Sequence, residues 1–242
     1  GFISSKLLNS KMTLDFAYTL YLILLEDTSI PNDQIKRYVQ KWFVLSTLTS
    51  RYISSPETVM DRDMRSIKEK GFLKYFEEVE ASTLSDTFWE VTLPQNLETS
   101  SVNSPAFNTF IAAQINLNCN SLLTNGTKIS DLVTVSGDVH HIFPRDYLKK
   151  NGVDSKVKYN QVANYVYLDT QVNKAISNNP PCVYFAKVKE QCNTGNIQLG
   201  NISDEATLAV NLAENCIPQN IFDMDVRDYD TFLAERRKLM AK

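Results

Sequence analysis

Several features that would define a function are scarce or missing in this chain. It has 242 residues but only 7 glycines, and it lacks the G-x-x-x-x-G-K-[ST] loop that binds nucleotide phosphates. Its 4 cysteines form no C-x-x-C pair and no zinc-binding spacing, so we expect reduced thiols in a cytoplasmic protein. The most apolar stretch, Phe16 to Leu25, is too short and too often interrupted by tyrosine and threonine to cross a bilayer. We therefore expect no membrane partner.

Positive charge is also in short supply. The net charge of -3 and the pI near 5.5 argue against a freestanding, non-specific DNA binder, which would normally be basic. A hydrophobic content of 43% with 22% charged residues is ordinary for a soluble globular protein. The length allows a sizeable core in one or two domains.

Histidine is the scarcest titratable residue type, and both copies are adjacent. His140 and His141 lie within the segment Asp138 to Pro144, which reads Asp-Val-His-His-Ile-Phe-Pro. Histidine titrates near neutral pH and is a common metal ligand, so two neighbouring copies indicate a reaction centre. Adjacent residues on a regular strand face opposite ways, however. The pair therefore serves one site only at a strand end or bulge, and Pro144 supports a strand that ends there.

The first part of the chain predicts a bundle of helices. Leu14 to Leu25 is apolar and aromatic, as in a buried helix, with Thr13 as its N-cap. After a break at Pro31-Asn32-Asp33, apolar residues recur at helical spacing. Ser55-Pro56-Glu57 is typical of a helix start, and Gly71 of a helix end.

The rest of the chain predicts strands as well as helices. Glu80 to Ser104 is polar, which suggests a boundary, and a helix resumes at Ser104-Pro105. Leu132 to Val139 is rich in β-branched residues and predicts a strand that leads into the two histidines. Tyr165 to Leu168 predicts a second strand, and Val172 to Ser177 the start of a helix.

The tail predicts two more helices, Ser203 to Leu212 and Tyr229 to Leu239. We interpret the cluster Arg236-Arg237-Lys238 as the usual preference for cations at a helix C-terminus.

Hydrolysis of a phosphodiester requires an activated water, a cation near the developing charge and groups that hold the phosphate in line. A neutral imidazole can take the proton from the water, and a divalent ion can stabilise the charge. Because Mg²⁺ keeps several water ligands, two or three protein residues are enough to hold it.

The two adjacent histidines, followed by Asn164 and Asn173, resemble the HNH (His-Me finger) nuclease motif. The pattern is similar in particular to the nuclease half of GmrSD-type, Type IV modification-dependent restriction endonucleases. The resemblance rests on Val139-His140-His141-Ile142-Phe143-Pro144, on Asn164 in Ala163 to Leu168, and on Asn173 in Asn173 to Ser177. It extends to Tyr229 to Arg237, and upstream to Lys41-Trp42-Phe43 and Arg51-Tyr52.

The resemblance implies a role for each matching residue. His141 matches the general base that activates water, and Asn164 the asparagine that pins the loop between the strands and orients the base. His140 and Asn173 match metal ligands, and we expect Asp138 to add a ligand or a hydrogen bond to an imidazole. The implied cofactor is Mg²⁺ or Mn²⁺, although Ni²⁺ or Zn²⁺ also suits a histidine-bearing site.

Basic residues after the histidines suit a phosphate-bearing substrate. We expect Arg145, Lys149, Lys150 and Lys174 to contact it, and Lys156 and Lys158 add to the local positive charge. The alternative interpretation is a solvated lysine-rich loop.

The resemblance implies a metal-dependent DNA endonuclease that leaves 5′-phosphate and 3′-hydroxyl ends and restricts foreign or base-modified phage DNA. Members of this family also carry an N-terminal domain or subunit that uses nucleotide, which this chain lacks. Because the chain opens at Gly1 without methionine, we expect it to be a segment of a longer protein. Three alternatives stay open: a non-catalytic module that binds nucleic acid or a partner, an enzyme acting on RNA, and a purely structural helical protein.

The expected fold class is α+β and mostly helical. Residues 1–100 would form a helical domain, and residues 101–242 an HNH-type nuclease domain. The ββα-metal core of the latter would span about 132–178, flanked by helices.

Overall fold

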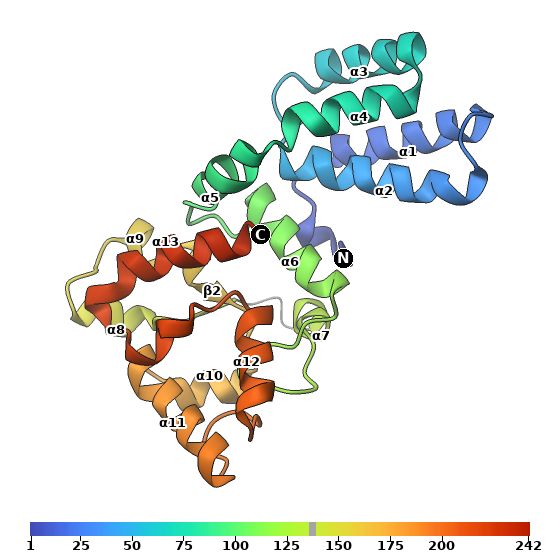
Figure 1. Cartoon of the computed structure of the whole chain (residues 1–242). Helices are drawn as coiled ribbons and strands as arrows, with labels where there is room; N and C mark the ends of the chain where they lie inside the picture. Colours follow the sequence, from blue (N-terminus) through green and yellow to red (C-terminus); the bar gives the residue numbers. More distant parts are fainter. Residues whose placement is uncertain (136–138) are drawn as a thin grey trace.

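The computed structural model describes residues 1–135 and 139–242, and its helices gather in two lobes (Figure 1). The helices α1 to α4 form one lobe, and the elements from α6 onward form the other, with α5 between them. The elements in chain order are η1 (Ser5–Leu7), α1 (Lys11–Glu26), α2 (Asn32–Leu48), α3 (Pro56–Lys70), α4 (Phe72–Thr83), the π-helix η2 (Phe88–Thr92), α5 (Leu93–Asn96), α6 (Pro105–Asn116), α7 (Ile129–Val135), β1 (His140–His141), α8 (Arg145–Lys150), α9 (Lys156–Tyr159), η3 (Val162–Asn164), β2 (Tyr165–Val166), α10 (Thr170–Ile176), α11 (Pro181–Thr194), α12 (Glu205–Glu214), η4 (Gln219–Asp223), η5 (Val226–Asp228) and α13 (Tyr229–Met240).

The helical lobe has its own core. Trp42 is fully buried among aromatic rings, and its indole N–H donates to the hydroxyl of Tyr52 at 3.0 Å. Beside it lies Asp63, which is also fully buried and accepts hydrogen bonds from Arg51, Tyr52 and Tyr75. Arg51 and Tyr52 lie between α2 and α3, and Tyr75 lies on α4, so these hydrogen bonds tie α3 to its neighbours in the lobe.

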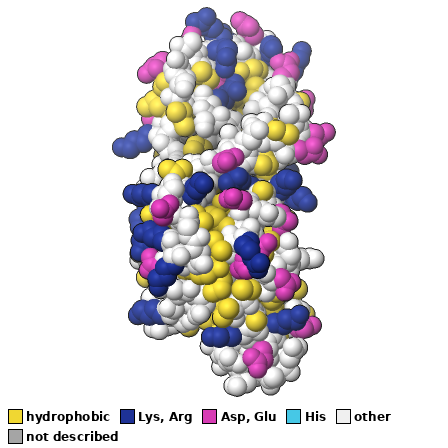
Figure 2. Space-filling view, turned by 90° about the vertical axis from the view of Figure 1, so that its left-hand side faces the viewer, with side chains coloured by type: hydrophobic (Ala, Val, Ile, Leu, Met, Phe, Trp, Pro, Cys, Tyr) yellow, Lys and Arg dark blue, Asp and Glu magenta, His cyan; other side chains and the backbone are white. Residues whose placement is uncertain are grey.

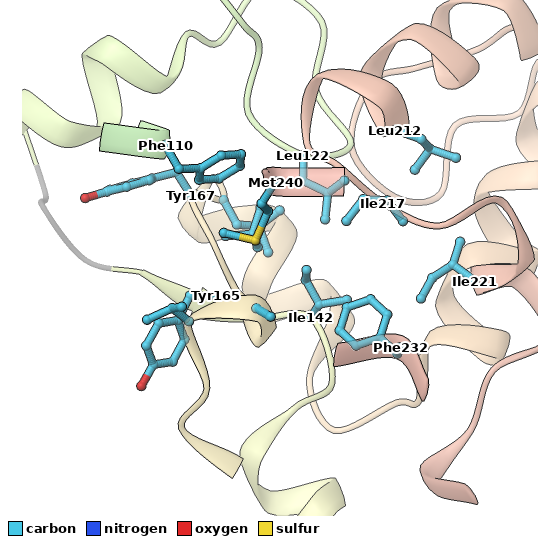
Figure 3. Packing of buried hydrophobic residues seen from close by; sticks show 14 of the residues in the cluster. Phe110, Leu122, Ile142, Tyr165, Tyr167, Leu212, Ile217, Ile221, Phe232 and Met240 are labelled. Carbon is cyan, nitrogen blue, oxygen red and sulfur yellow. The ribbon is translucent and has the colours of Figure 1, made fainter. Parts of the chain in front are cut away.

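The second lobe is built around a larger core in which the helices surround a small sheet. This core also takes in Leu7, Leu48, Leu93 and Leu97, so residues from the first hundred positions pack into it. Figure 3 shows Ile142, which follows β1, and Phe232 of α13 within this cluster. The protein is therefore mostly helical with one two-stranded sheet in the described residues, in agreement with the expected α+β class.

The sheet consists of two short antiparallel strands. His140 of β1 pairs with Val166 of β2, and His141 pairs with Tyr165. The loop between the strands contains α8, α9 and η3, and α10 follows β2. Strand, long loop, strand and helix thus occur in the expected order.

The prediction of a strand over Leu132 to Val139 is wrong for residues 132–135. Residues Ile129–Val135 form helix α7 instead. Ile129 and Val133 are both buried, and residues four apart share one face of a helix. Burial of this face outweighs the strand preference of the β-branched residues. Among the described residues of this region, His140 and His141 form the strand, and residues 136–138 of the predicted span lie outside the part of the chain that the structure describes.

Several predicted boundaries are confirmed. Helix α3 begins at Pro56 and ends before Gly71, which has a positive φ of 79°. Ser104 caps α6 by accepting a hydrogen bond from the Phe107 N–H at 3.2 Å. The strand predicted from Tyr165 is present but ends at Val166 rather than Leu168, and helix α10 and the two C-terminal helices are present.

Other predictions at the level of single elements are wrong. Helix α1 begins at Lys11, so the buried Thr13 lies inside it and is not its N-cap. The polar stretch after Glu80 is largely helical, because η2 and α5 bury Phe88 and Leu93 in the second core. The preference for cations at a helix C-terminus does not explain Arg236, because its side chain is fully buried. Within the described residues, none of the helices has both the length and the apolar character needed to cross a membrane.

Candidate active site

Asn164 joins the two ends of the loop between β1 and β2. Its side chain is fully buried, and its Oδ1 accepts a hydrogen bond from the Phe143 N–H at 2.8 Å. Its Nδ2 donates to the carbonyl oxygens of Phe143 at 3.1 Å and Tyr159 at 3.3 Å. The Ile142 N–H also donates to the Asn164 carbonyl at 2.9 Å. These bonds fix the residues just after the histidines against the start of β2.

His141 lies against this pinned loop. Its Nε2 is 2.9 Å from Oδ1 of Asn160, and its ring meets the ring of Tyr165 edge-on, with centroids 5.1 Å apart. With an amide oxygen as its partner, Nε2 carries the proton, and Nδ1 is the basic nitrogen of the neutral ring. Burial lowers the pKa of His141, an effect that the Asn160 bond partly offsets. The imidazole is therefore neutral at physiological pH, as a general base must be.

His140 lies in different surroundings from His141. It lines a cavity of about 870 Å³, whose other walls are formed by the N-terminal segment around Lys6, by α6 and by Tyr167. His141 is absent from that lining. Figure 3 shows the hydroxyls of Tyr165 and Tyr167 directed away from the packed core. Tyr165 contacts the ring of His141, whereas Tyr167 lines the cavity of His140, so each histidine has its own tyrosine neighbour.

The remaining predicted metal ligands are not gathered around the histidines by any described contact. Asn173 is half-buried on α10, and its side chain makes no hydrogen bond within the described residues. Asp138 lies outside the described residues. Over residues 1–135 and 139–242 there is no group of three or more His, Cys, Asp and Glu side chains that could hold a metal ion.

The donor set nevertheless has a defined chemistry. His140 would offer an imidazole nitrogen and Asn173 an amide oxygen. Such a set suits a divalent cation that completes its coordination shell with water and phosphate oxygens. In donor type the two residues suit such a cation, but no contact among the described residues brings His140 and Asn173 together.

The predicted substrate contacts form part of an exposed basic surface. Arg145, Lys149 and Lys150 are exposed on α8, which begins directly after Pro144. Lys149 lies over the ring of Tyr159, 5.1 Å from its centroid, and Arg145 pairs with Asp146 at 3.3 Å. Lysine and arginine side chains gather along one edge of the face that Figure 2 shows, with acidic side chains among them. Lys174 is exposed on α10.

Sequence reasoning missed three residues near the histidines. Asn160 carries no motif and is recognised only through its bond to His141. Lys6 lies more than a hundred residues from His140 in the sequence but lines the same cavity. Tyr229 donates from its hydroxyl to the carbonyls of Lys158 at 3.0 Å and Tyr159 at 3.2 Å, and so holds the loop from the other side. Of these, only Tyr229 lay in a segment that the resemblance had marked.

Comparison with known proteins does not assign this chain to a family. No protein-family model, no curated protein and no solved structure matches this chain.

Proposed function

We propose that this chain is a metal-dependent endonuclease of the HNH (His-Me finger) type that hydrolyses phosphodiester bonds in DNA. The observation that carries the proposal is the Asn164 clamp: a buried asparagine pins the loop between two strands, and the half-buried His141 is bonded to the same loop through Asn160. The proposal is supported by these hydrogen bonds and by the order of strand, loop, strand and helix around His141.

In the proposed mechanism, Nδ1 of His141 takes a proton from the attacking water. The bond from Nε2 to Asn160 fixes the tautomer and orientation of the ring. When bound, Mg²⁺ or Mn²⁺ supplies positive charge at the scissile phosphate and at the leaving 3′ oxygen. His140 and Asn173 would hold that ion, and Asp138 would assist them. Arg145, Lys149, Lys150 and Lys174 attract the phosphate backbone.

The biological role that suits this chemistry is restriction of foreign or base-modified DNA in the cytoplasm. In that role the chain would work with a nucleotide-using domain or subunit, which would select the DNA. This part of the proposal rests on the resemblance of the Asp138 to Asn173 region to Type IV restriction enzymes.

A second candidate is a non-catalytic module that binds nucleic acid or a partner. One observation favours it: His140 lines a cavity that His141 does not line, so the two histidines do not face one described pocket. The exposed basic residues of α8 would serve such a module equally well.

Plasmid cleavage separates the two candidates. Plain and hydroxymethylcytosine-containing plasmids are incubated with the protein and Mn²⁺ or Mg²⁺, in parallel with EDTA and with the His141→Ala variant. The proposal predicts cleavage that is lost both with EDTA and with the substitution. Plasmid that is bound but never cut would support the non-catalytic module, and the ratio of modified to plain plasmid cut would show whether this chain selects its DNA.

A further inference from the structure

Arg236 of α13 is an unusual residue in the second lobe, because its guanidinium group is fully buried. Its Nη1 donates to the carbonyl oxygens of Ala163 at 2.9 Å and Tyr165 at 2.6 Å. Its Nε and Nη2 both donate to the carbonyl oxygen of Asn215, at 3.4 and 3.1 Å. All of these acceptors are backbone atoms.

No aspartate or glutamate among the described residues pairs with this cation. Burial lowers the pKa of Arg236 to about 10, so the group stays protonated at neutral pH. A buried charge without an opposite partner is costly. An apolar side chain of similar length, such as methionine, would fill the same space without that cost. What the guanidinium adds is a rigid fork that fixes several carbonyl groups at once.

The position of these carbonyls connects Arg236 with the candidate site. Ala163 and Tyr165 are the two neighbours of Asn164, so the guanidinium holds the backbone on both sides of the clamp residue. Asn164 in turn holds Phe143 and Tyr159. Those residues are two positions from His141 and one position from Asn160, the partner of its ring.

Helix α13 also packs against the two ends of the loop between β1 and β2. The ring of Phe232 lies 4.8 Å from that of Phe143, and the helix packs against η3, which contains Asn164. Together with the hydroxyl of Tyr229, these contacts bring one face of α13 against both ends of the loop.

We propose that Arg236 is a positioning residue of the nuclease site: it fixes the backbone on both sides of Asn164, and thereby the loop that orients His141. The inference rests on the proposed function for its catalytic consequence. Its structural consequence, the rigidity of the Asn164 clamp, is independent of any activity.

The test compares Arg236→Met and Arg236→Lys with a matched control, Asn211→Ala. Asn211 is also buried in this lobe, and its side chain also bonds to backbone atoms, those of Ser121, Leu123 and Thr124, none of which belongs to the loop between β1 and β2. Hydrogen exchange of the Phe143 amide, which donates to Asn164, is measured by NMR, and cleavage kinetics are measured on the same preparations.

We expect both Arg236 variants to speed exchange of the Phe143 amide by at least about tenfold. They should lower kcat about 10- to 100-fold while KM changes little, because a misplaced base weakens the chemical step rather than binding. Asn211→Ala should lower the melting temperature without either effect. Arg236→Lys keeps the positive charge. If Arg236→Met does not fold, amide exchange and cleavage are measured on Arg236→Lys alone. Phe143 exchange in the Arg236 variants equal to that in Asn211→Ala would overturn the inference. If the native protein cuts no DNA, the proposed function fails while the exchange data still decide the role of Arg236.

Discussion

At the scale of single residues, Asn164 shows how one side chain organises a loop. It satisfies its amide with three hydrogen bonds to the backbone at two separate places, Phe143 and Tyr159. Because these bonds are buried, their loss leaves polar backbone groups without partners in a water-excluded region. The same atoms that stabilise the lobe therefore also set the position of His141.

Replacement of Asn164 by alanine should lower the free energy of unfolding by about 2–3 kcal/mol. The matched control is Asn173→Ala, because that asparagine is half-buried and makes no side-chain hydrogen bond among the described residues. It should change stability by less than about 0.5 kcal/mol. Urea unfolding of the two variants measures the difference, and equal losses would contradict the role given to the clamp.

The half-buried ring of His141 predicts how stability depends on pH. Burial lowers its pKa in the folded state below the value of about 6.5 in the unfolded chain. Its contribution to stability is therefore fully present above pH 6.5 and is lost as the pH falls through the folded-state pKa. Urea unfolding of the native protein and of His141→Gln at pH 8 and pH 5 should show a larger loss at pH 5 for the native protein. Parallel losses would show that the ring is not buried in its neutral form.

At the scale of elements, the lobe is held together by close approaches of segments distant in the sequence. The segment between α11 and α12 meets the segment around Leu123 at Gly200. A Cβ on Gly200 would lie 2.0 Å from the Leu123 carbonyl oxygen, and the residue has a positive φ of 67°. Gly195, which ends α11, also has a positive φ, of 74°, but has open space around it.

These two glycines form a matched pair. Gly195→Ala should cost about 1–2 kcal/mol, from the backbone conformation alone. Gly200→Ala should cost about 1–3 kcal/mol more, because the methyl group collides with a backbone atom. Urea unfolding measures both changes. A Gly200 variant no less stable than the Gly195 variant would mean that the two segments do not approach so closely.

The elements also show what a sequence can and cannot reveal. The helix starts at Ser55-Pro56 and Ser104-Pro105 follow from local chemistry, so they were predictable. Helix α7 was not, because its β-branched residues favour a strand and only burial of Ile129 and Val133 reverses that preference. The roles of Asn160 and Arg236 depend on contacts with residues 19 to 73 positions away, which no local pattern encodes.

At the scale of the whole molecule, the two lobes have separate hydrophobic cores. The helical lobe depends on Asp63, which is buried with Arg51 and two tyrosines. Each lobe can therefore be perturbed by changes that leave the core of the other intact, and the candidate site belongs to the second lobe.

Asp63→Asn leaves the guanidinium of Arg51 without its opposite charge and should destabilise the helical lobe by about 3–5 kcal/mol. Hydrogen exchange followed by mass spectrometry should show faster exchange in α1 to α4, with little change in peptides that contain β1 and β2. Equal acceleration in both lobes would show that they unfold as one unit.

The most direct test of the account is the cleavage rate of a 5′-labelled DNA duplex by the native protein and by His141→Ala, with Mn²⁺ present. Urea unfolding curves first establish that both proteins are folded. We predict products with 5′-phosphate and 3′-hydroxyl ends and a rate lower by a factor of about 10² to 10⁴ in the variant, as expected for loss of a general base. Cleavage at the native rate by folded His141→Ala would contradict the assignment of this histidine and of the site built around it.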